Sequence, residues 1–366
     1  MAWKNTVAGG AQPRRLASLP ECATVFGLAL ALMGAFALAG CTGSGAASGA
    51  SAATGSAVGS AAAEAGSSAA KAPAAKAGKV SFTDDLGNKV TVENPQRVVA
   101  CMGSFADAWI QAGGSSTLVA ATDDAFENYG VDSGKVASVG RSTSLNLEQI
   151  LAQKPDFVIM TGTADGKHDT GVSQTGLKAA LDKSGVPVAF FKVSTFDDYL
   201  RMLKTLTSIT GRKDLYKKHG ADVQARIKQD VKKYSVADRK GGAPTVLVVS
   251  AYSKGVKAQD STGMTGAMLK ALGAKNVVDE NPSLLSDFSL EAAAKLDPDY
   301  VFVLAVGRGD AAAQANVKKS VEDDPAWQGL TAVKEGRLTV LDGAHFLYKP
   351  NAAWDESYKI LGEALQ

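Results

Sequence analysis

The sequence predicts an α/β protein of two similar, Rossmann-like lobes, and a repeated motif is the first reason. Leu147-Glu148 is followed by Pro155-Asp156 and an apolar strand, and Leu290-Glu291 by Pro298-Asp299 and a second such strand. The two glutamates are 143 positions apart, whereas solenoid repeats recur about every 20–50 residues. A unit that recurs once at this distance indicates two related lobes, each with one acidic residue at an equivalent place.

Two further observations indicate the type of sheet and the connection between the lobes. Strand-like and helix-like segments alternate in both halves, which is typical of mainly parallel sheets covered by helices. Residues 214–240 place apolar side chains at helical spacing between lysines and arginines, without a proline. They predict one long linking helix with a solvated basic face, although that face would also suit a membrane surface. Gly220 is its one flexible position, where Ala should favour the helix.

The folded part divides into a first lobe at 79–212, a linking helix at 213–242 and a second lobe at 243–366. Alternating polarity around the Asp84-Asp85-Leu86-Gly87-Asn88 turn predicts a hairpin over 80–92, and glycines end several helices. The other elements expected in the first lobe are strands at 97–101, 118–121, 157–160 and 188–191 and helices at 105–112, 147–153 and 174–183. The second lobe should contain strands at 245–249, 276–278, 300–304 and 337–341 and helices at 265–272 and 352–365.

Residues 1–40 have the features of a lipoprotein signal peptide: a basic start, an apolar run and small residues before Cys41. Leu38-Ala39-Gly40-Cys41 matches the bacterial lipobox, so we expect Cys41 to be lipidated and to anchor the chain at the extracytoplasmic face of the cell membrane. The apolar run of about 18 residues would also suit a membrane-spanning anchor. Residues 41–78 are almost only Gly, Ala, Ser and Thr, which predicts a flexible tether.

The charge balance argues against a nucleic-acid partner. The chain has 39 basic and 37 acidic residues, of which three and one precede Cys41, so the remainder is close to neutral. Cys101 is the one cysteine of the folded part, and we expect it to be a buried apolar residue at a strand end. The three histidines are widely spaced and no cluster with metal-ligand spacing is visible, which argues against a bare metal ion.

An ordered set of short motifs resembles a known family. Its members are Asp84-Asp85-Leu86-Gly87, Pro95-Gln96-Arg97-Val98-Val99, Val139-Gly140, both Pro-Asp units, 266–277, Trp327, Leu330, 332–337 and 350–354. Over residues 80–366 the set is similar to the substrate-binding lipoproteins of ABC importers for iron-siderophores, haem or cobalamin. The resemblance implies a monomeric binding protein, not an enzyme and without a cofactor of its own, that delivers a metal chelate to a permease and its ATPase.

In that family one glutamate of each lobe docks onto basic residues of the permease, and motif position assigns these roles to Glu148 and Glu291. Two carboxylates at a fixed separation can form charge-assisted pairs with arginines in one register. A single glutamate in the first turn of a helix is also favoured by the helix dipole. The matched pair is therefore what favours docking.

Ligands of open α/β sheets bind outside the carboxyl ends of the strands. The segments after those ends offer aromatic faces and a few charges, which suit a large organic ligand, and Arg or Lys would pair with an anionic chelate. The expected ligand-binding residues are Ser104, Phe105, Asp124, Phe126, Arg141, Thr161, Thr163, Tyr252, Lys254, Arg308, His345 and Tyr348. Family frequency favours a ferric siderophore. Haem, with Tyr252 or His345 as axial ligand, and cobalamin are the alternatives.

Two readings from other classes stay open. A secreted enzyme such as an esterase is one, although the sequence has no Gly-x-Ser-x-Gly elbow, His-Glu-x-x-His motif or phosphate loop. A scaffold or adhesion lipoprotein without any ligand is the other.

Overall fold

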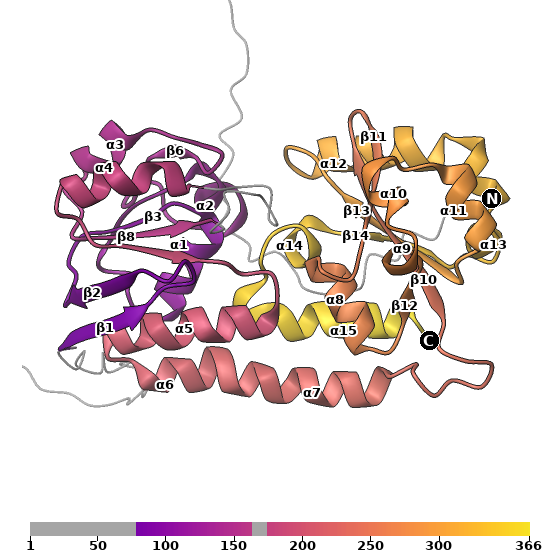
Figure 1. The fold of residues 1–366 in the computed structure, drawn as a ribbon, viewed down its shortest axis with the longest axis horizontal. Helices are drawn as coiled ribbons and strands as arrows, with labels where there is room; N and C mark the ends of the chain where they lie inside the picture. The colour runs from indigo at the N-terminus through magenta and orange to yellow at the C-terminus, as the bar shows by residue number, and fades with distance from the viewer. Residues whose placement is uncertain (1–77, 163–173) are drawn as a thin grey trace, which may run out of the picture. The chain divides into compact units, whose positions relative to one another are not determined.

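A computed structural model describes residues 78–162 and 174–366, which belong to one structural unit. It contains two five-stranded sheets with helices around them and a helical segment that connects them (Figure 1). The expected α/β class with two mainly parallel sheets is confirmed. No helix in these two ranges is long and apolar enough to cross a membrane.

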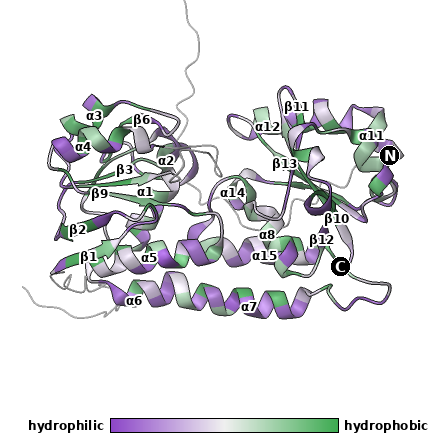
Figure 2. Cartoon of the chain, in the orientation of Figure 1, coloured by the Kyte–Doolittle hydropathy of each residue, from purple (hydrophilic) through white to green (hydrophobic). Residues whose placement is uncertain are grey.

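The sheet of the first lobe is fully parallel, with the strand order β5-β4-β3-β8-β9. Its strands are β3 (Val98–Ala100), β4 (Leu118–Ala121), β5 (Ala137–Ser138), β8 (Phe157–Thr161) and β9 (Val188–Phe191). Strands β3, β8 and β9 are buried along their whole length, because elements cover both faces of the sheet. The strands accordingly stand out as hydrophobic in Figure 2, whereas the helices alternate in polarity.

The remaining elements of this lobe lie around that sheet. Its helices are α1 (Gly103–Gln111), α2 (Asp123–Asn128), α3 (Leu147–Ala152), α4 (Lys178–Lys183), which follows a 3-10 turn at Thr175–Leu177, and α5 (Phe196–Thr210). The predicted first hairpin is confirmed as β1 (Lys79–Thr83) paired with β2 (Lys89–Glu93). A second short hairpin pairs β6 (Gly140–Arg141) with β7 (Ser144–Leu145).

The sheet of the second lobe has the order β11-β10-β13-β14, and only β11 runs antiparallel to its neighbour. Its strands are β10 (Thr245–Tyr252), β11 (Gly255–Gln259), β12 (Lys275–Asn276), which pairs with the start of β10, β13 (Tyr300–Ala305) and β14 (Leu338–Leu341). Its α-helices are α8 (Met264–Ala271), α9 (Val277–Glu280), α10 (Ser283–Ser286), α11 (Leu290–Leu296), α12 (Asp310–Val317), α13 (Thr331–Lys334), α14 (Gly343–Phe346) and α15 (Trp354–Ala364).

One predicted strand of this lobe is wrong. Residues 276–278 do not continue as a strand, because the side chain of Asn276 accepts a hydrogen bond from the N–H of Val278 at 3.1 Å and starts α9. Asp279 and Glu280 then lie in the first turn of that helix, where acidic residues are favoured. The sequence Asn-Val-Val-Asp-Glu is therefore a capped helix start rather than a β-branched strand.

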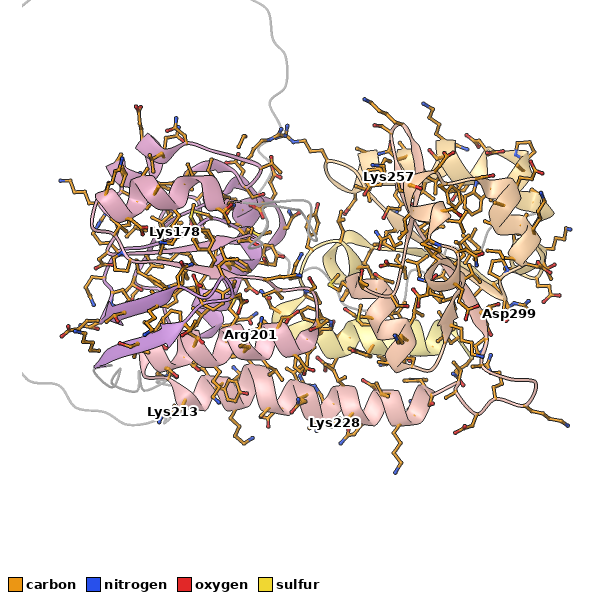
Figure 3. All side chains as sticks on the ribbon, in the orientation of Figure 1. Lys178, Arg201, Lys213, Lys228, Lys257 and Asp299 are labelled. Atoms are coloured by element: carbon orange, nitrogen blue, oxygen red, sulfur yellow. The ribbon has the colours of Figure 1, made fainter. Side chains whose placement is uncertain are left out.

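The linking helix is shorter than predicted and is not uniform. It consists of α6 (Lys213–Tyr216), a π-helical turn (Lys217–Ala221) and α7 (Asp222–Tyr234). It ends at Tyr234 rather than near 240 or 242, because Val236 is buried and its N–H donates to the carbonyl of Leu272. The basic face is exposed as predicted, and Figure 3 shows Lys228 on the outer side of the helix.

Gly220 is packed rather than flexible. It is buried in the π-helical turn, and a Cβ there would lie 3.0 Å from Cδ2 of Leu200 and 3.2 Å from Cδ2 of Leu203 on α5. Crowding against α5 therefore opposes the gain in helix propensity that Ala should bring at this position, and the net effect stays a prediction. The turn contacts α5, and α7 packs against α15, so the linking helix is in contact with helices of both lobes (Figure 1).

Candidate functional site

The two repeated units begin in the same way in three dimensions. In the first lobe the side chain of Asn146 accepts a hydrogen bond from the N–H of Glu148 at 2.8 Å and caps α3. In the second lobe Ser289, at the equivalent position, accepts one from the N–H of Ala292 at 3.2 Å and caps α11. Each cap places a glutamate, Glu148 or Glu291, in the first turn of its helix.

The units also end in the same way. Lys154 and Asp297, at equivalent positions before the prolines, both have left-handed backbones, with φ of 49° and 40°, which is uncommon for residues other than glycine. The aspartate after each proline then holds the start of the first sheet strand of its lobe. Asp156 accepts hydrogen bonds from the backbone N–H groups before β3, and Asp299 accepts one from the N–H of Thr245 at 2.7 Å. The sequence repeat is therefore a repeat of structure.

Glu148 and Glu291 are both exposed. The side chain of Glu291 is 83% exposed and lies 3.2 Å from Nζ of Lys295, one turn further along α11. Glu148 has no ion-pair partner within 4.0 Å among the residues that the structure describes. An exposed ion pair of the kind that Glu291 makes contributes little to stability, so both carboxylates are available to a partner. Docking by these residues stays a prediction.

At the carboxyl ends of the first sheet, the structure brings Ser104 and Asp124 together. Asp124 accepts a hydrogen bond from the N–H of Gly103 at 2.8 Å, at the start of α1. A Cβ on Gly103 would lie 2.6 Å from the backbone nitrogen of Ala125, so only glycine allows α1 and α2 to come this close. Ser104 is buried beside them, and Thr161, also buried, is at the end of β8.

Phe105 does not line a site, which corrects the prediction. It is 1% exposed and packs edge-on against Phe191 with ring centroids 6.4 Å apart, because its position in α1 faces the sheet. Phe126 is half-buried and packs against the same core, and Arg141 is exposed on β6. The predicted residues Cys41 and Thr163 lie outside the described residues.

In the second lobe, Tyr252 is exposed as the last residue of β10, and Lys254 and Arg308 are exposed after the ends of β10 and β13. Their role in ligand binding stays a prediction. Arg308 lies 3.6 Å from Glu127 of α2 in the first lobe, so one predicted residue already has an ionic partner. Tyr348 is half-buried. Its pKa is raised by burial and then by the charge of Glu127 and of other nearby carboxylates. Residues of both lobes therefore come together around Glu127.

His345 is held by carboxylates, and its role as a ligand-binding residue or as an axial ligand of haem stays a prediction. Nδ1 lies 2.9 Å from Asp342, and Nε2 lies 3.3 Å from Glu356. The hydrogen bond with Asp342 raises the pKa of His345, against a smaller opposing effect of burial. Both ring nitrogens thus have carboxylate partners, and His345 connects α14 with α15.

Sequence reasoning missed Gln174, which ties the ends of two strands together. Its side chain accepts from the N–H of Thr161 at 3.0 Å and donates to the carbonyl of Cys101 at 2.6 Å and to that of Ser142 at 3.0 Å. A buried glutamine that satisfies three backbone groups fixes the carboxyl edge of the sheet. In the sequence Gln174 is a single glutamine at the start of a predicted helix. That pattern is too common to indicate a role.

A second group that sequence reasoning missed joins the lobes. Asn351 is fully buried with φ of 50°, and its Nδ2 donates to the carbonyl of Ser104 at 2.8 Å and to Asp107 at 2.7 Å. Tyr129 donates to the carbonyl of Lys349 at 3.1 Å, and burial, with the charge of Asp107, raises the pKa of Tyr129. These contacts join residues more than 200 positions apart, so no local sequence pattern predicts them.

Three buried side-chain oxygens at this junction have no hydrogen-bond partner among the described residues. They are Oδ1 of Asp124, Oδ1 of Asn351 and Oγ1 of Thr122. Such atoms suit hydrogen-bond donors from water or from a bound molecule. No group of three or more His, Cys, Asp or Glu that could hold a metal ion occurs among the described residues. Cys101 is buried as predicted, and burial raises the pKa of its thiol.

The chain is similar to several known proteins. A family model described as "Periplasmic binding protein" matches residues 99–344. YhfQ of Bacillus subtilis (strain 168), provisionally named as an ABC transporter substrate-binding lipoprotein, is 24% identical over 283 residues, which cover 74% of this chain and 83% of YhfQ.

Solved structures share the fold. The periplasmic haem-binding protein RhuT of Roseiflexus sp. RS-1, in its apo form, matches with a TM-score of 0.59 and 18% identity over 74% of this chain and 97% of RhuT. The periplasmic catecholate-siderophore binding protein VctP of Vibrio cholerae matches with a TM-score of 0.59 and 18% identity over 78% of this chain and 99% of VctP. At these identities the likeness concerns the fold alone.

Proposed function

Because the chain belongs to the periplasmic binding protein family, we propose that it captures a ferric siderophore, or a related large metal chelate, and delivers it to an ABC permease and its ATPase. The family consists of solute-binding proteins rather than enzymes, which sets the esterase reading aside. The observation that carries the proposal is the structural repeat that presents Glu148 and Glu291 in equivalent, exposed first turns. Two such carboxylates give a permease a two-point contact with a defined register.

The chelate binds at the carboxyl ends of the strands, where both lobes contribute groups. Tyr252 and Tyr348 supply aromatic surface, Arg141 and Arg308 supply positive charge, and Asp124 supplies a buried acceptor. This mixture suits a large organic ligand with few polar contacts. A siderophore is supported by the catecholate-siderophore protein among the proteins of like fold.

Haem is the second candidate ligand, and Tyr252 is the residue that favours it. This residue is 36% exposed at the end of β10, and a tyrosine can serve as axial ligand of haem iron. Tyr252 is favoured over His345 as axial ligand, because both nitrogens of His345 face carboxylates. Cobalamin, which needs no such ligand, stays a third possibility within the same class.

The membrane anchor is part of the proposal. Cys41 follows a lipobox and precedes a stretch of small residues up to 78. An acylated Cys41 would hold the protein on the extracytoplasmic face, and two or more acyl chains make such anchoring stable. The stretch would let the folded part reach a permease in the same membrane. We expect the folded part to act as a monomer.

Equilibrium titration with matched chelates tests the ligand. The full-length protein is titrated with a ferric tricatecholate, a ferric trihydroxamate, haemin and cyanocobalamin, and both tryptophan quenching and the visible spectrum are followed. The proposal expects saturable one-to-one binding of a ferric chelate with a broad visible charge-transfer band. A Soret band that saturates at one equivalent would replace the siderophore by haem. Binding of none of the four would refute the proposed ligand class.

A further inference from the structure

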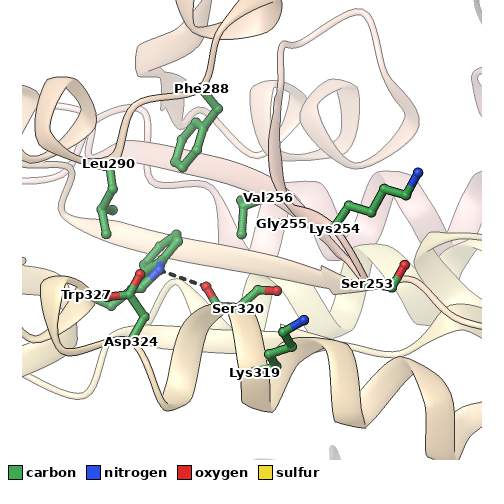
Figure 4. A pocket seen from close by; sticks show the side chains of 10 residues that line it. All are labelled: Ser253, Lys254, Gly255, Val256, Phe288, Leu290, Lys319, Ser320, Asp324 and Trp327. Carbon is green, nitrogen blue, oxygen red and sulfur yellow. Dashed lines mark hydrogen bonds between the residues drawn. The ribbon is translucent and has the colours of Figure 1, made fainter.

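A pocket in the second lobe is built from residues of that lobe only. It has a volume of about 490 Å³ and lies between the β10–β11 turn, the start of α11 and the segment after α12 (Figure 4). Phe288 and Trp327 stack at its apolar side, with ring centroids 6.3 Å apart, next to Val256 and Leu290. Nε1 of Trp327 donates to the carbonyl of Ser320 at 3.1 Å, which fixes the indole in place.

The opposite side of the pocket is cationic. Lys254 and Lys319 lie there with Ser253, across from the aromatic pair (Figure 4). Neither lysine has an ion-pair partner within 4.0 Å in the part of the chain that the structure describes. Asp324, the one acidic residue of the lining, is used to cap the N–H of Ala326 at 3.0 Å. Lys319 lies on a π-helical turn, Lys318–Glu322, and such turns are frequent at functional sites.

Two exposed apolar residues and Glu291 lie on, or next to, the elements that form this pocket. Tyr252 and Leu285 are the two large hydrophobic residues that are exposed among those described, at 36% and 43%. Tyr252 immediately precedes the β10–β11 turn, and Leu285 lies on α10, which packs against β11. Leu290 lines the pocket and is followed directly by Glu291. An apolar hollow with a polar rim is typical of a surface that contacts another molecule.

From these observations we propose that the pocket receives an apolar side chain of an extracytoplasmic loop of the permease, with an acidic residue beside it. The apolar side chain packs against Phe288, Leu290 and Trp327, and the acidic residue pairs with Lys319. A basic residue of the same loop pairs with Glu291. The second lobe thus contacts the permease through a positive and a negative charge as well as an apolar pocket. Two opposite charges at fixed positions allow only one orientation of docking. This inference rests on the proposed function.

Charge reversal at the pocket tests the inference. The full-length protein binds to the purified permease–ATPase complex in nanodiscs, and its apparent affinity is compared for the unmodified chain, Lys319→Glu, Leu290→Asp and Lys270→Glu. Lys270 is an exposed lysine of α8 that is not part of the pocket lining, so Lys270→Glu is the matched control. We expect Lys319→Glu and Leu290→Asp each to weaken binding at least about tenfold, and the control to stay within about twofold.

The outcomes separate the inference from the proposed function. If the unmodified protein does not bind the complex, the proposed function fails. If it binds and Lys319→Glu binds equally well, the pocket is not part of the contact and the inference is overturned. Lys319 is exposed, so its variant should fold normally, and circular dichroism checks this. A lysine in place of an acidic residue of the permease loop should restore the binding of Lys319→Glu, which a merely structural effect would not do.

Discussion

Replacement of Asp107 by Asn should stabilise the protein at neutral pH, although it changes a buried group that joins the lobes. Burial raises the pKa of Asp107 from 3.8 to about 6, and a hydrogen bond from Asn351 opposes this only in part. Asp107 accepts hydrogen bonds from Gln111 and Asn351, both at 2.7 Å. The carbonyl oxygen of an asparagine can accept both, so Asp107→Asn removes the charge and keeps the contacts.

The size and the sign follow from linkage. Between about pH 4 and pH 6 the folded protein keeps a proton that the unfolded chain has released, so the contribution of Asp107 to stability falls as the pH rises through this window. At pH values above this window, a pKa shift from 3.8 to about 6 corresponds to a loss of about 3 kcal/mol in the free energy of unfolding. The side chain keeps some contact with solvent, which screens the charge, so we expect a gain of about 1–3 kcal/mol for Asp107→Asn at pH 7.5.

Urea unfolding followed by circular dichroism measures this gain at pH 7.5 and at pH 4. The gain should be present at pH 7.5 and small at pH 4, where the folded protein keeps the proton of Asp107 and the unfolded chain, with a pKa of 3.8, is itself partly protonated. Asp107→Ala is the matched comparison: it also removes the charge but leaves the donors of Gln111 and Asn351 unpaired, so it should not stabilise. Equal or lower stability of Asp107→Asn at pH 7.5, or a gain that does not depend on pH, would refute the reasoning.

Three further predictions concern the anchor, the repeated units and the linking helix. Cys41→Ala should release the protein from the membrane fraction, and retention after a high-salt wash of correctly processed protein would contradict the lipid anchor. Asp156→Ala and Asp299→Ala should each cost about 1–3 kcal/mol in urea unfolding, whereas unchanged midpoints would show that the strand starts need no anchor. Ligand binding should change the radius of gyration in solution scattering only slightly, because a continuous helix must bend along its length; a decrease typical of hinge-type binding proteins would contradict this.

The sequence predicted best what is encoded locally. The Pro-Asp units, the first hairpin and most strands of the two sheets were readable because periodicity, turn residues and apolar runs are properties of short segments. The edge strands β5 and β11 were not predicted. The predictions were wrong where the contact of a single residue determines the secondary structure against the local hydrophobic pattern. Asn276 caps a helix inside what looked like a strand, and Val236 anchors to the carbonyl of Leu272 and so ends the linking helix early.

Contacts between distant segments were not predictable in this way. Phe105 was expected at the ligand site because it follows a strand, yet the direction of its side chain depends on how α1 packs on the sheet. The carboxylates that hold His345 were not recognised as its partners, although Asp342 is three positions away. Asn351 and Asp107, 244 positions apart, meet only in the folded protein. A single sequence contains no signal for such a pair.

The central claim is that the protein delivers a chelate to a permease through Glu148 and Glu291, and uptake measured beside affinity tests it most directly. Cells that carry Glu148→Ala, Glu291→Ala or the unmodified chain are supplied with the radioactive ferric chelate that the purified protein binds. Each substitution should reduce uptake strongly, while the affinity of the purified variant for that chelate stays within about a factor of two, because removal of a paired interface charge costs a few kcal/mol at the contact alone. Unchanged uptake, or a parallel loss of uptake and affinity, would contradict the account.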